Sequence, residues 1–184
     1  MDQLAILLAI AAFIALAAGL AVVLRGTGQI VARTREVERF RGTVKDLAVR
    51  VDASLGGAVG QIDAVRRRQV GPDTIADTID AAMDAVGRYT DEAKALRGPR
   101  KAQGIRADLV DELERARRAL EMVEHGRSTM AVARRGPREL EAQTSIKRGY
   151  LNLIHAREAF ARHALDAQAF EVDVKTRNAG RGSI

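Results

Sequence analysis

The sequence predicts an all-α protein, with one N-terminal transmembrane helix followed by a cytoplasmic antiparallel helical bundle or coiled coil of about four helices. Three observations indicate this fold class. Residues 4–24 contain no charged or polar side chain, every proline follows a glycine, and apolar residues recur at heptad spacing between the glycine–proline pairs. The expected regions are a short outer stub (1–3), the transmembrane helix (4–24), a cytoplasmic helical domain (25–175) and a flexible basic tail (176–184).

The apolar run 4–24 has the length of a membrane span. Its 21 residues form a helix of ~31 Å, which matches a hydrocarbon core of ~30 Å. A cleaved signal peptide has a basic N-terminal region and a shorter apolar stretch, whereas only Asp2 and Gln3 precede this run and Arg25 follows it. We therefore expect a retained anchor in a lipid bilayer.

Basic residues predict the orientation of that anchor. No Lys or Arg precedes the run, and basic residues near a span stay in the cytoplasm. This indicates a single-pass protein of the plasma membrane, with its N-terminus outside and its C-terminal domain cytoplasmic. Six basic residues follow the run closely, and they are also the candidate contacts to anionic lipid. They are Arg25, Arg33, Arg35, Arg39, Arg41 and Lys45.

A stripe of small residues lies within the predicted span. Ala11, Ala15 and Gly19 recur every four residues, a pattern that lets two membrane helices approach closely. The stripe is a candidate surface for self-association.

The three glycine–proline pairs predict helix boundaries at Gly71–Pro72, Gly98–Pro99 and Gly136–Pro137. Glycine suits the left-handed turn after a helix, and proline suits the first turn of the next one. The resulting helices cover about 29–70, 73–97, 105–135 and 138–175, with His125–Gly126 as an alternative end of the third. Short connections make neighbouring helices antiparallel, which predicts an up-down-up-down bundle.

The first of these helices carries the strongest heptad pattern. Two rows of apolar residues form a seam that is typical of helix pairing. One row is Ile30, Val37, Val44, Val51, Ala58 and Val65, and the other is Phe40, Leu47, Leu55 and Ile62. Gly56, Gly57 and Gly60 interrupt the seam as a hinge or as a site of close helix contact, and the continued phase favours close contact.

Composition and motifs argue against an enzyme and against a cofactor or metal site. The absence of Cys excludes disulfides, thiolate metal ligands and a cysteine nucleophile. Neither a G-x-S-x-G turn nor a phosphate-binding loop occurs, and no Glu stands three residues before any His, as a di-iron bundle requires. The row Asp73, Asp77, Asp80, Asp84 and Asp91 is better explained as a solvated face than as a divalent-cation site.

The leading hypothesis is a non-enzymatic scaffold or adaptor at the bacterial plasma membrane. Its heptad helices would bind a protein partner or a second copy, through residues that include Val37, Phe40, Val44, Leu47 and Val51. One alternative is a membrane-tethered polyanion binder, because the net charge is +6. Anionic lipid is then the expected ligand, and nucleic acid is less favoured because few aromatic residues could stack on bases.

A second alternative is a subunit of a larger membrane complex, whose other chains would cover the broadly apolar fourth helix. The layout resembles that of bacterial membrane-anchored coiled-coil proteins. This is a resemblance of architecture, without a motif that carries functional residues across.

Overall fold

The structure is a computed structural model. It describes the backbone of residues 2–132 and 136–170, and the side chains of 13, 14, 16, 17, 31–132 and 136–170. Residues 39–171 form one compact unit, and the preceding part of the chain is described separately.

All regular structure in the described residues is helical. The elements are α1 (Asp2–Arg66), η1 (Pro72–Ile75), α2 (Ala76–Ala95), η2 (Arg100–Ala102), α3 (Gln103–Val132) and α4 (Pro137–Ala169), where η1 and η2 are short 3₁₀ helices. The predicted all-α class and the helical bundle are therefore confirmed. Each glycine–proline pair also lies at a junction between helices, as expected.

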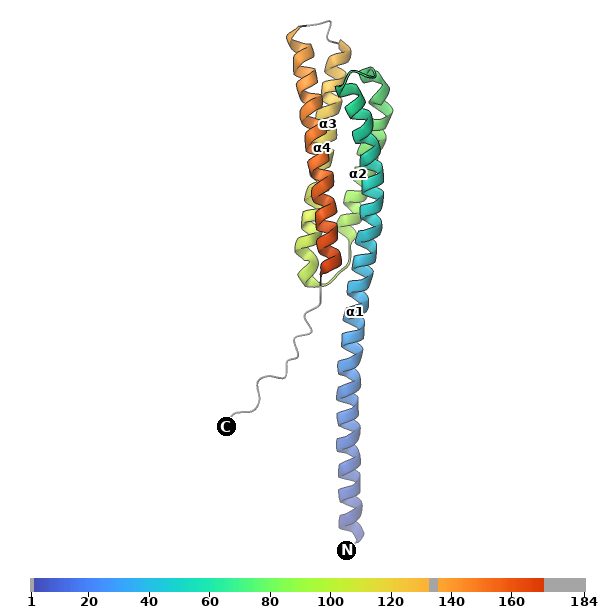
Figure 1. Ribbon diagram of the computed structural model, residues 1–184. Coiled ribbons are helices and arrows are strands. Elements are labelled where there is room, and N and C mark those ends of the chain that lie inside the picture. The colour runs from blue at the N-terminus through green and yellow to red at the C-terminus, as the bar shows by residue number, and fades with distance from the viewer. Residues whose placement is uncertain (1, 133–135, 171–184) are drawn as a thin grey trace. The chain divides into compact units, whose positions relative to one another are not determined.

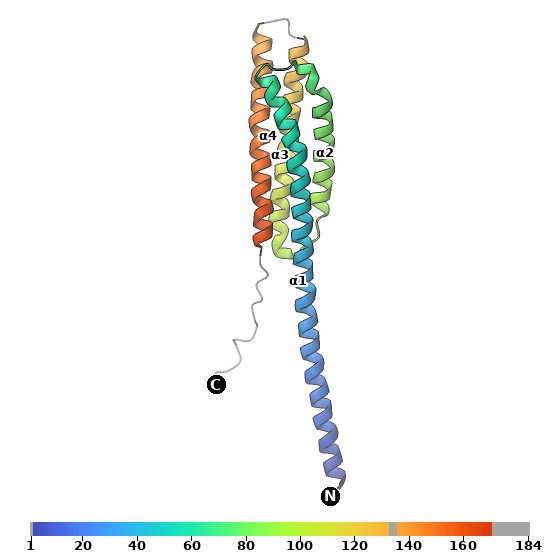
Figure 2. The same ribbon diagram turned by 45° about the vertical axis from the view of Figure 1, so that its right-hand side comes forward.

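Four helices lie side by side in the unit formed by residues 39–171 (Figures 1 and 2). Polar contacts trace the ring of neighbours: Arg50 of α1 to Glu92 of α2, Lys94 of α2 to Glu114 of α3, Ser145 of α4 to Met122 of α3, and Arg157 of α4 to Asp52 of α1. Along each pair the residue numbers run in opposite directions. The bundle is thus antiparallel, and α4 closes it against α1.

The core of the bundle contains the heptad seam of α1. From residue 37 onward every seam residue is buried: Val37, Phe40, Val44, Leu47, Val51, Leu55, Ala58, Ile62 and Val65. From Phe40 on they belong to one apolar cluster with residues of the other three helices, including Ile79, Leu113 and Leu153. Ile30, the first residue of the seam, lies outside the described side chains.

The predicted membrane anchor lies mostly outside the described side chains, since only residues 13, 14, 16 and 17 of the run 4–24 are included. In the part of the chain that the structure covers, no helix offers a stretch long and apolar enough to cross a bilayer. Only the backbone is described at Ala11, Ala15 and Gly19, and the tail 176–184 lies outside the described residues.

Helix ends differ from the expected ones in three places. The first helix does not begin near Gln29, because α1 is continuous from Asp2 and ends at Arg66. α3 passes through His125–Gly126 and ends at Val132, so the alternative stop is wrong. α4 ends at Ala169 because Phe170 is extended, with φ −63° and ψ 114°.

The glycines act differently from the expectation. Gly71 is extended, with φ −73°, and among the glycines that the structure describes only Gly136, the N-cap of α4, has a positive φ, of 110°. In the seam, a Cβ added at Gly57 or Gly60 would meet no neighbouring atom within 4 Å. The predicted close helix contact at these two positions is therefore wrong.

The close contact lies instead between α3 and α4. A Cβ at Gly149 would lie 2.7 Å from the carbonyl oxygen of Ala119, and one at Gly126 would lie 2.8 Å from the carbonyl oxygen of Ala142. Such distances require the two backbones to move apart. The hydroxyl of Ser145 also donates to the carbonyl of Met122 at 2.8 Å, as two closely packed helices allow.

Candidate functional site

The basic residues predicted to contact lipid occupy two kinds of environment. Arg33, Arg35, Arg39 and Lys45 are exposed on α1, where their charges are accessible to a ligand. Arg25 lies outside the described side chains. Arg41 differs from the others, because it is half-buried and packs against the end of α4.

Arg41 is part of the contact between α1 and α4. Its guanidinium donates to the carbonyl of Phe170, and its own carbonyl accepts a hydrogen bond from Nε2 of Gln168 at 2.9 Å. A backbone carbonyl just past a helix C-terminus has no partner within the helix, so a cation there satisfies it and offsets the helix dipole. The contacts of Arg41 therefore hold the C-terminal end of α4 against α1.

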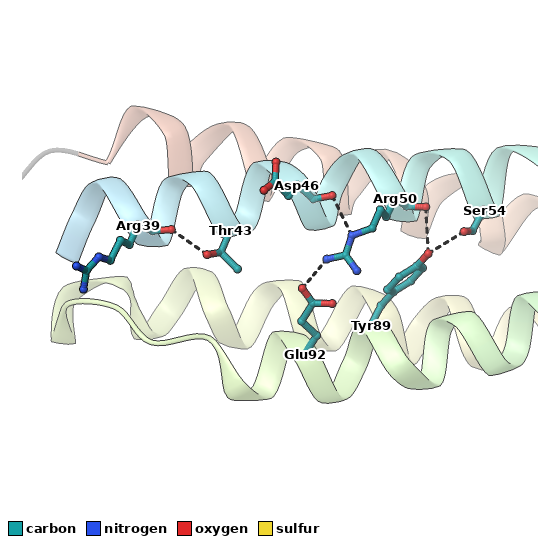
Figure 3. A network of polar contacts seen from close by, with 7 residues as sticks. All are labelled: Arg39, Thr43, Asp46, Arg50, Ser54, Tyr89 and Glu92. Carbon is teal, nitrogen blue, oxygen red and sulfur yellow. Dashed lines mark hydrogen bonds and ion pairs between the residues drawn. The ribbon is translucent and has the colours of Figure 1, made fainter. Parts of the chain in front are cut away.

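A polar network joins α1 to α2 on the outside of the bundle (Figure 3). The hydroxyl groups of Ser54 and Tyr89 are 2.9 Å apart, and Arg50 forms an ion pair with Glu92 at 2.5 Å. Arg50 also lies over the ring of Tyr89, 5.5 Å from its centroid. The hydrogen bond from Arg50 to Glu92 raises the pKa of Arg50.

The network fixes the register of the two helices. The hydroxyl of Tyr89 contacts that of Ser54 and also donates to the carbonyl of Arg50 at 3.4 Å. In Figure 3, the backbone carbonyls of Arg39 and Asp46 accept bonds from the side chains of Thr43 and Arg50, respectively.

A second polar cluster lies at the end of the bundle where α1 leads into η1. Arg66 donates twice to Oδ1 of Asp63, at 2.9 and 2.6 Å, and lies over the ring of Tyr150. The hydrogen bond from Arg66 lowers the pKa of Asp63 below its ordinary value of 3.8. Arg67 pairs with the other carboxylate oxygen of Asp63 at 2.7 Å.

The acidic and histidine residues that could ligate a metal ion are not brought together by the fold. The aspartates of the acidic row are all exposed along η1 and α2, and in the described residues no three potential ligands gather as a metal ion requires. Glu121 pairs with Arg117 at 3.0 Å rather than with His125. His163 lies 3.7 Å from Asp166 and 3.9 Å from Asp108, at the surface.

Three exposed leucines form a widely spaced line along the outside of α4, with exposed charged residues such as Lys147 and Glu158 between them. Leu140, Leu151 and Leu165 are 68%, 43% and 68% exposed. Their spacing of 11 and 14 residues places them within about 40° of each other around the helix, at ~100° per residue. The sequence suggested a helix that is apolar over a wide arc, but it did not separate these exposed leucines from the buried ones.

Two of the cavities along the described bundle have charged side chains in their lining. One, of about 470 Å³, lies between α3 and α4, and its lining residues include Arg118, Met122 and His125. The other, of about 610 Å³, lies beside the Arg66 cluster and has a lining that is about half polar and half apolar. Neither could be found from the sequence, because each joins residues from segments distant in the chain.

No protein-family model, curated protein or solved structure matches this chain.

Proposed function

We propose that the chain is a non-enzymatic scaffold or adaptor of the plasma membrane. The helix formed by residues 4–24 anchors it in a single pass, with the N-terminus outside. The bundle lies on the cytoplasmic side and binds a helix of a protein partner on its outer surface. The observation that carries this proposal is the line of exposed leucines on α4, beside a core that is already closed.

Exposed apolar residues support the anchor. The run 4–24 is uncharged throughout, and its described side chains Phe13, Ile14 and Leu16 are 74%, 61% and 73% exposed. Large contiguous apolar surface is unfavourable in water and marks contact with lipid or protein. Exposed Arg33, Arg35 and Arg39 follow the run on α1, as the positive-inside rule requires of a cytoplasmic flank.

Membrane extraction tests the anchor. After washing membranes at alkaline pH, we expect the full chain to stay in the pellet, because a spanning helix resists extraction. Replacing Leu8 and Leu16 with Arg costs about 2.5–3.5 kcal/mol per residue for insertion, and should move the protein to the supernatant. Release of the unaltered chain by the wash would contradict the anchor.

The burial of the seam determines where a partner can bind. Phe40, Val44 and Leu47 fill the core of the chain's own bundle, so they do not offer a free surface for a second helix. On α4, Leu140, Leu151 and Leu165 remain exposed on one side, along a line that a partner helix could follow. This surface replaces the seam as the proposed site of association.

A pull-down from native membranes in mild detergent tests the scaffold role. We expect a stoichiometric protein partner with the unaltered chain, and loss of that partner when the three leucines are changed to Ser. Val49→Ser is the matched control, because Val49 is 63% exposed on α1. Equal recovery of the partner with the unaltered chain, the triple-leucine variant and Val49→Ser would exclude the α4 surface as the binding site. If only further copies of this chain were recovered, the scaffold would be a homo-oligomer.

The second candidate is a polyanion binder that uses the exposed cations Arg33, Arg35, Arg39 and Lys45 of α1. Each cation near an anionic leaflet adds about 1 kcal/mol, and this attraction weakens with salt. Flotation with anionic vesicles at increasing salt, compared with the variant that carries Gln at all four positions, measures it. If vesicle binding did not change with salt, the polyanion-binding function would be excluded. If the chain bound nucleic acid more tightly than vesicles, its ligand would be nucleic acid and not lipid.

A further inference from the structure

The larger cavity lies at the end of the bundle where α1 leads into η1 and α4 begins, at the top of Figure 1. It has a volume of about 610 Å³, within the ~300–1,000 Å³ of ordinary ligand sites. Val65, Met130 and Ile146 from three different helices provide apolar wall, and Val70 and Pro72 add to it. The rest of the lining is polar, in about equal share, so the site favours a ligand that is apolar on one side and polar on the other.

The polar lining of the cavity carries a positive charge. Arg66, Arg68 and Lys147 line it together with a single carboxylate, Glu139. Asp63 compensates the charge of Arg66. The two other cations, Arg68 and Lys147, then face a single negative charge in the lining, that of Glu139. Arg68 lies 3.9 Å from Glu139, beyond hydrogen-bond distance, and that carboxylate also accepts a bond from Gln143 at 3.0 Å. Lys147 is exposed and forms no ion pair with any group in the described residues.

The backbone at Arg68 adds an independent observation. Its φ is 60°, and it is the one residue other than glycine with a positive φ in the described part of the chain. The turn it occupies has the hydrogen bonds of a Schellman motif, from the amide of Arg68 to Val65 and from the amide of Gln69 to Ala64. Glycine is the usual residue at this position. Strained residues cluster at ligand sites, and here the strain places a guanidinium beside the cavity.

We propose that this cavity binds a small amphiphilic anion. Lys147 and Arg68 bind its carboxylate, sulfonate or phosphate group, and the apolar body lies against Val65, Met130 and Ile146. The two cations select for the anion, since a neutral ligand of the same shape gains none of the charge-assisted hydrogen bonds. Arg66, held by Asp63 and Tyr150, is a fixed part of the wall.

Isothermal titration of the full chain in an uncharged detergent tests the proposal, with naphthalene-2-sulfonate as the probe. The same titration into detergent alone gives the background. We expect saturable one-to-one binding, about tenfold tighter than that of the neutral 2-naphthalenemethanol, because a hydrogen bond to a charged group is lost with the alcohol. Equal affinities for the two compounds would overturn the proposal.

Variants separate binding from folding. Lys147→Gln should weaken sulfonate binding about tenfold, and Arg68→Gly should weaken it while raising the melting temperature, because glycine relieves the backbone strain. Arg67→Gln is the matched control, since Arg67 is adjacent in sequence but does not line the cavity, and it should bind as the unaltered chain does. Unchanged affinity in both Lys147→Gln and Arg68→Gly would exclude this cavity as the site.

Discussion

At the scale of single residues, Arg68 occupies a turn position that favours glycine. An L-residue with a side chain at φ 60° meets a steric clash that glycine avoids, at a cost of about 1–2 kcal/mol. Glycine in turn loses more backbone entropy on folding. We therefore expect Arg68→Gly to stabilise the bundle by a net ~0.5–1 kcal/mol, measured as a higher melting temperature by circular dichroism.

Arg67→Gly is the control for that substitution. Arg67 has a normal negative φ, since it is absent from the residues with positive φ, and its side chain, which pairs with Asp63, is 59% exposed. Glycine there should destabilise the bundle by ~0.5–1 kcal/mol. Changes of the same sign at both positions would show that the left-handed turn is not the cause.

Glu124 provides a test by pH. Arg127 donates to both of its carboxylate oxygens at 2.7 Å, and this lowers the pKa of Glu124 below its ordinary value of 4.5. A carboxyl whose pKa is lower in the folded chain contributes stability above its unfolded pKa, and loses that contribution as the pH falls through the folded pKa. Glu124→Gln should thus cost ~0.5–1 kcal/mol near neutral pH and progressively less below about pH 4.5.

The melting temperature of Glu124→Gln, followed from pH ~7 to pH ~3, measures this difference. Glu141→Gln is the control, because Glu141 is exposed on α4 and has no ion pair among the described residues. It should follow the unaltered chain at each pH. A gap between Glu124→Gln and the unaltered chain that stays constant with pH would contradict the assigned ion pair.

At the scale of helix pairs, α3 and α4 pack with their backbones close together at Gly126 and Gly149. An alanine Cβ at Gly149 would lie 2.6 Å from Cγ2 of Val123, and one at Gly126 would lie 2.7 Å from Cγ1 of Ile146. Because backbone atoms also stand in the way, the two helices would have to separate. We expect Gly149→Ala to destabilise the bundle by about 1–3 kcal/mol, as overpacking does, and denaturant titration would measure it.

Gly57→Ala is the matched control on α1. Its Cβ would enter open space, so the change should stabilise the helix by ~0.5–1 kcal/mol through the loss of glycine's backbone entropy. The two Gly→Ala substitutions are therefore expected to have opposite signs. Stabilisation by both would mean that α3 and α4 are less closely packed than the structure has them.

The same glycines mark the limit of prediction from the sequence. Heptad spacing predicted the buried residues of α1 from Val37 to Val65 correctly, because apolar residues that repeat along a helix indicate which face of that helix is buried. Glycine–proline pairs likewise predicted the three junctions. The role of a helical glycine depends on what the neighbouring helix places opposite it, and that follows from the register between helices. Gly57 and Gly149 could not be distinguished on local grounds.

At the scale of the whole molecule, the seam of α1 could serve either the chain's own bundle or a pairing of two chains. Heptad patterns are the same in both arrangements, so the sequence left this open. In the structure, Phe40, Val44 and Leu47 lie in a core completed by α2, α3 and α4 of the same chain. Short connections at the glycine–proline junctions make this closure local, since each helix returns directly along the one before it.

An intramolecular core makes a specific prediction about the unfolding of the full chain in mild detergent. Leu47→Ala removes a fully buried side chain and should cost about 2–5 kcal/mol. Val49→Ala, two residues away and exposed, should change stability by no more than ~0.5 kcal/mol. Because Leu47 is already fully buried within a single chain, the melting temperature should not change over a tenfold range of protein concentration. A seam shared between two chains would instead give a melting temperature that rises with protein concentration. That result would show that Leu47 and its neighbours form a contact between two chains and not the core of one.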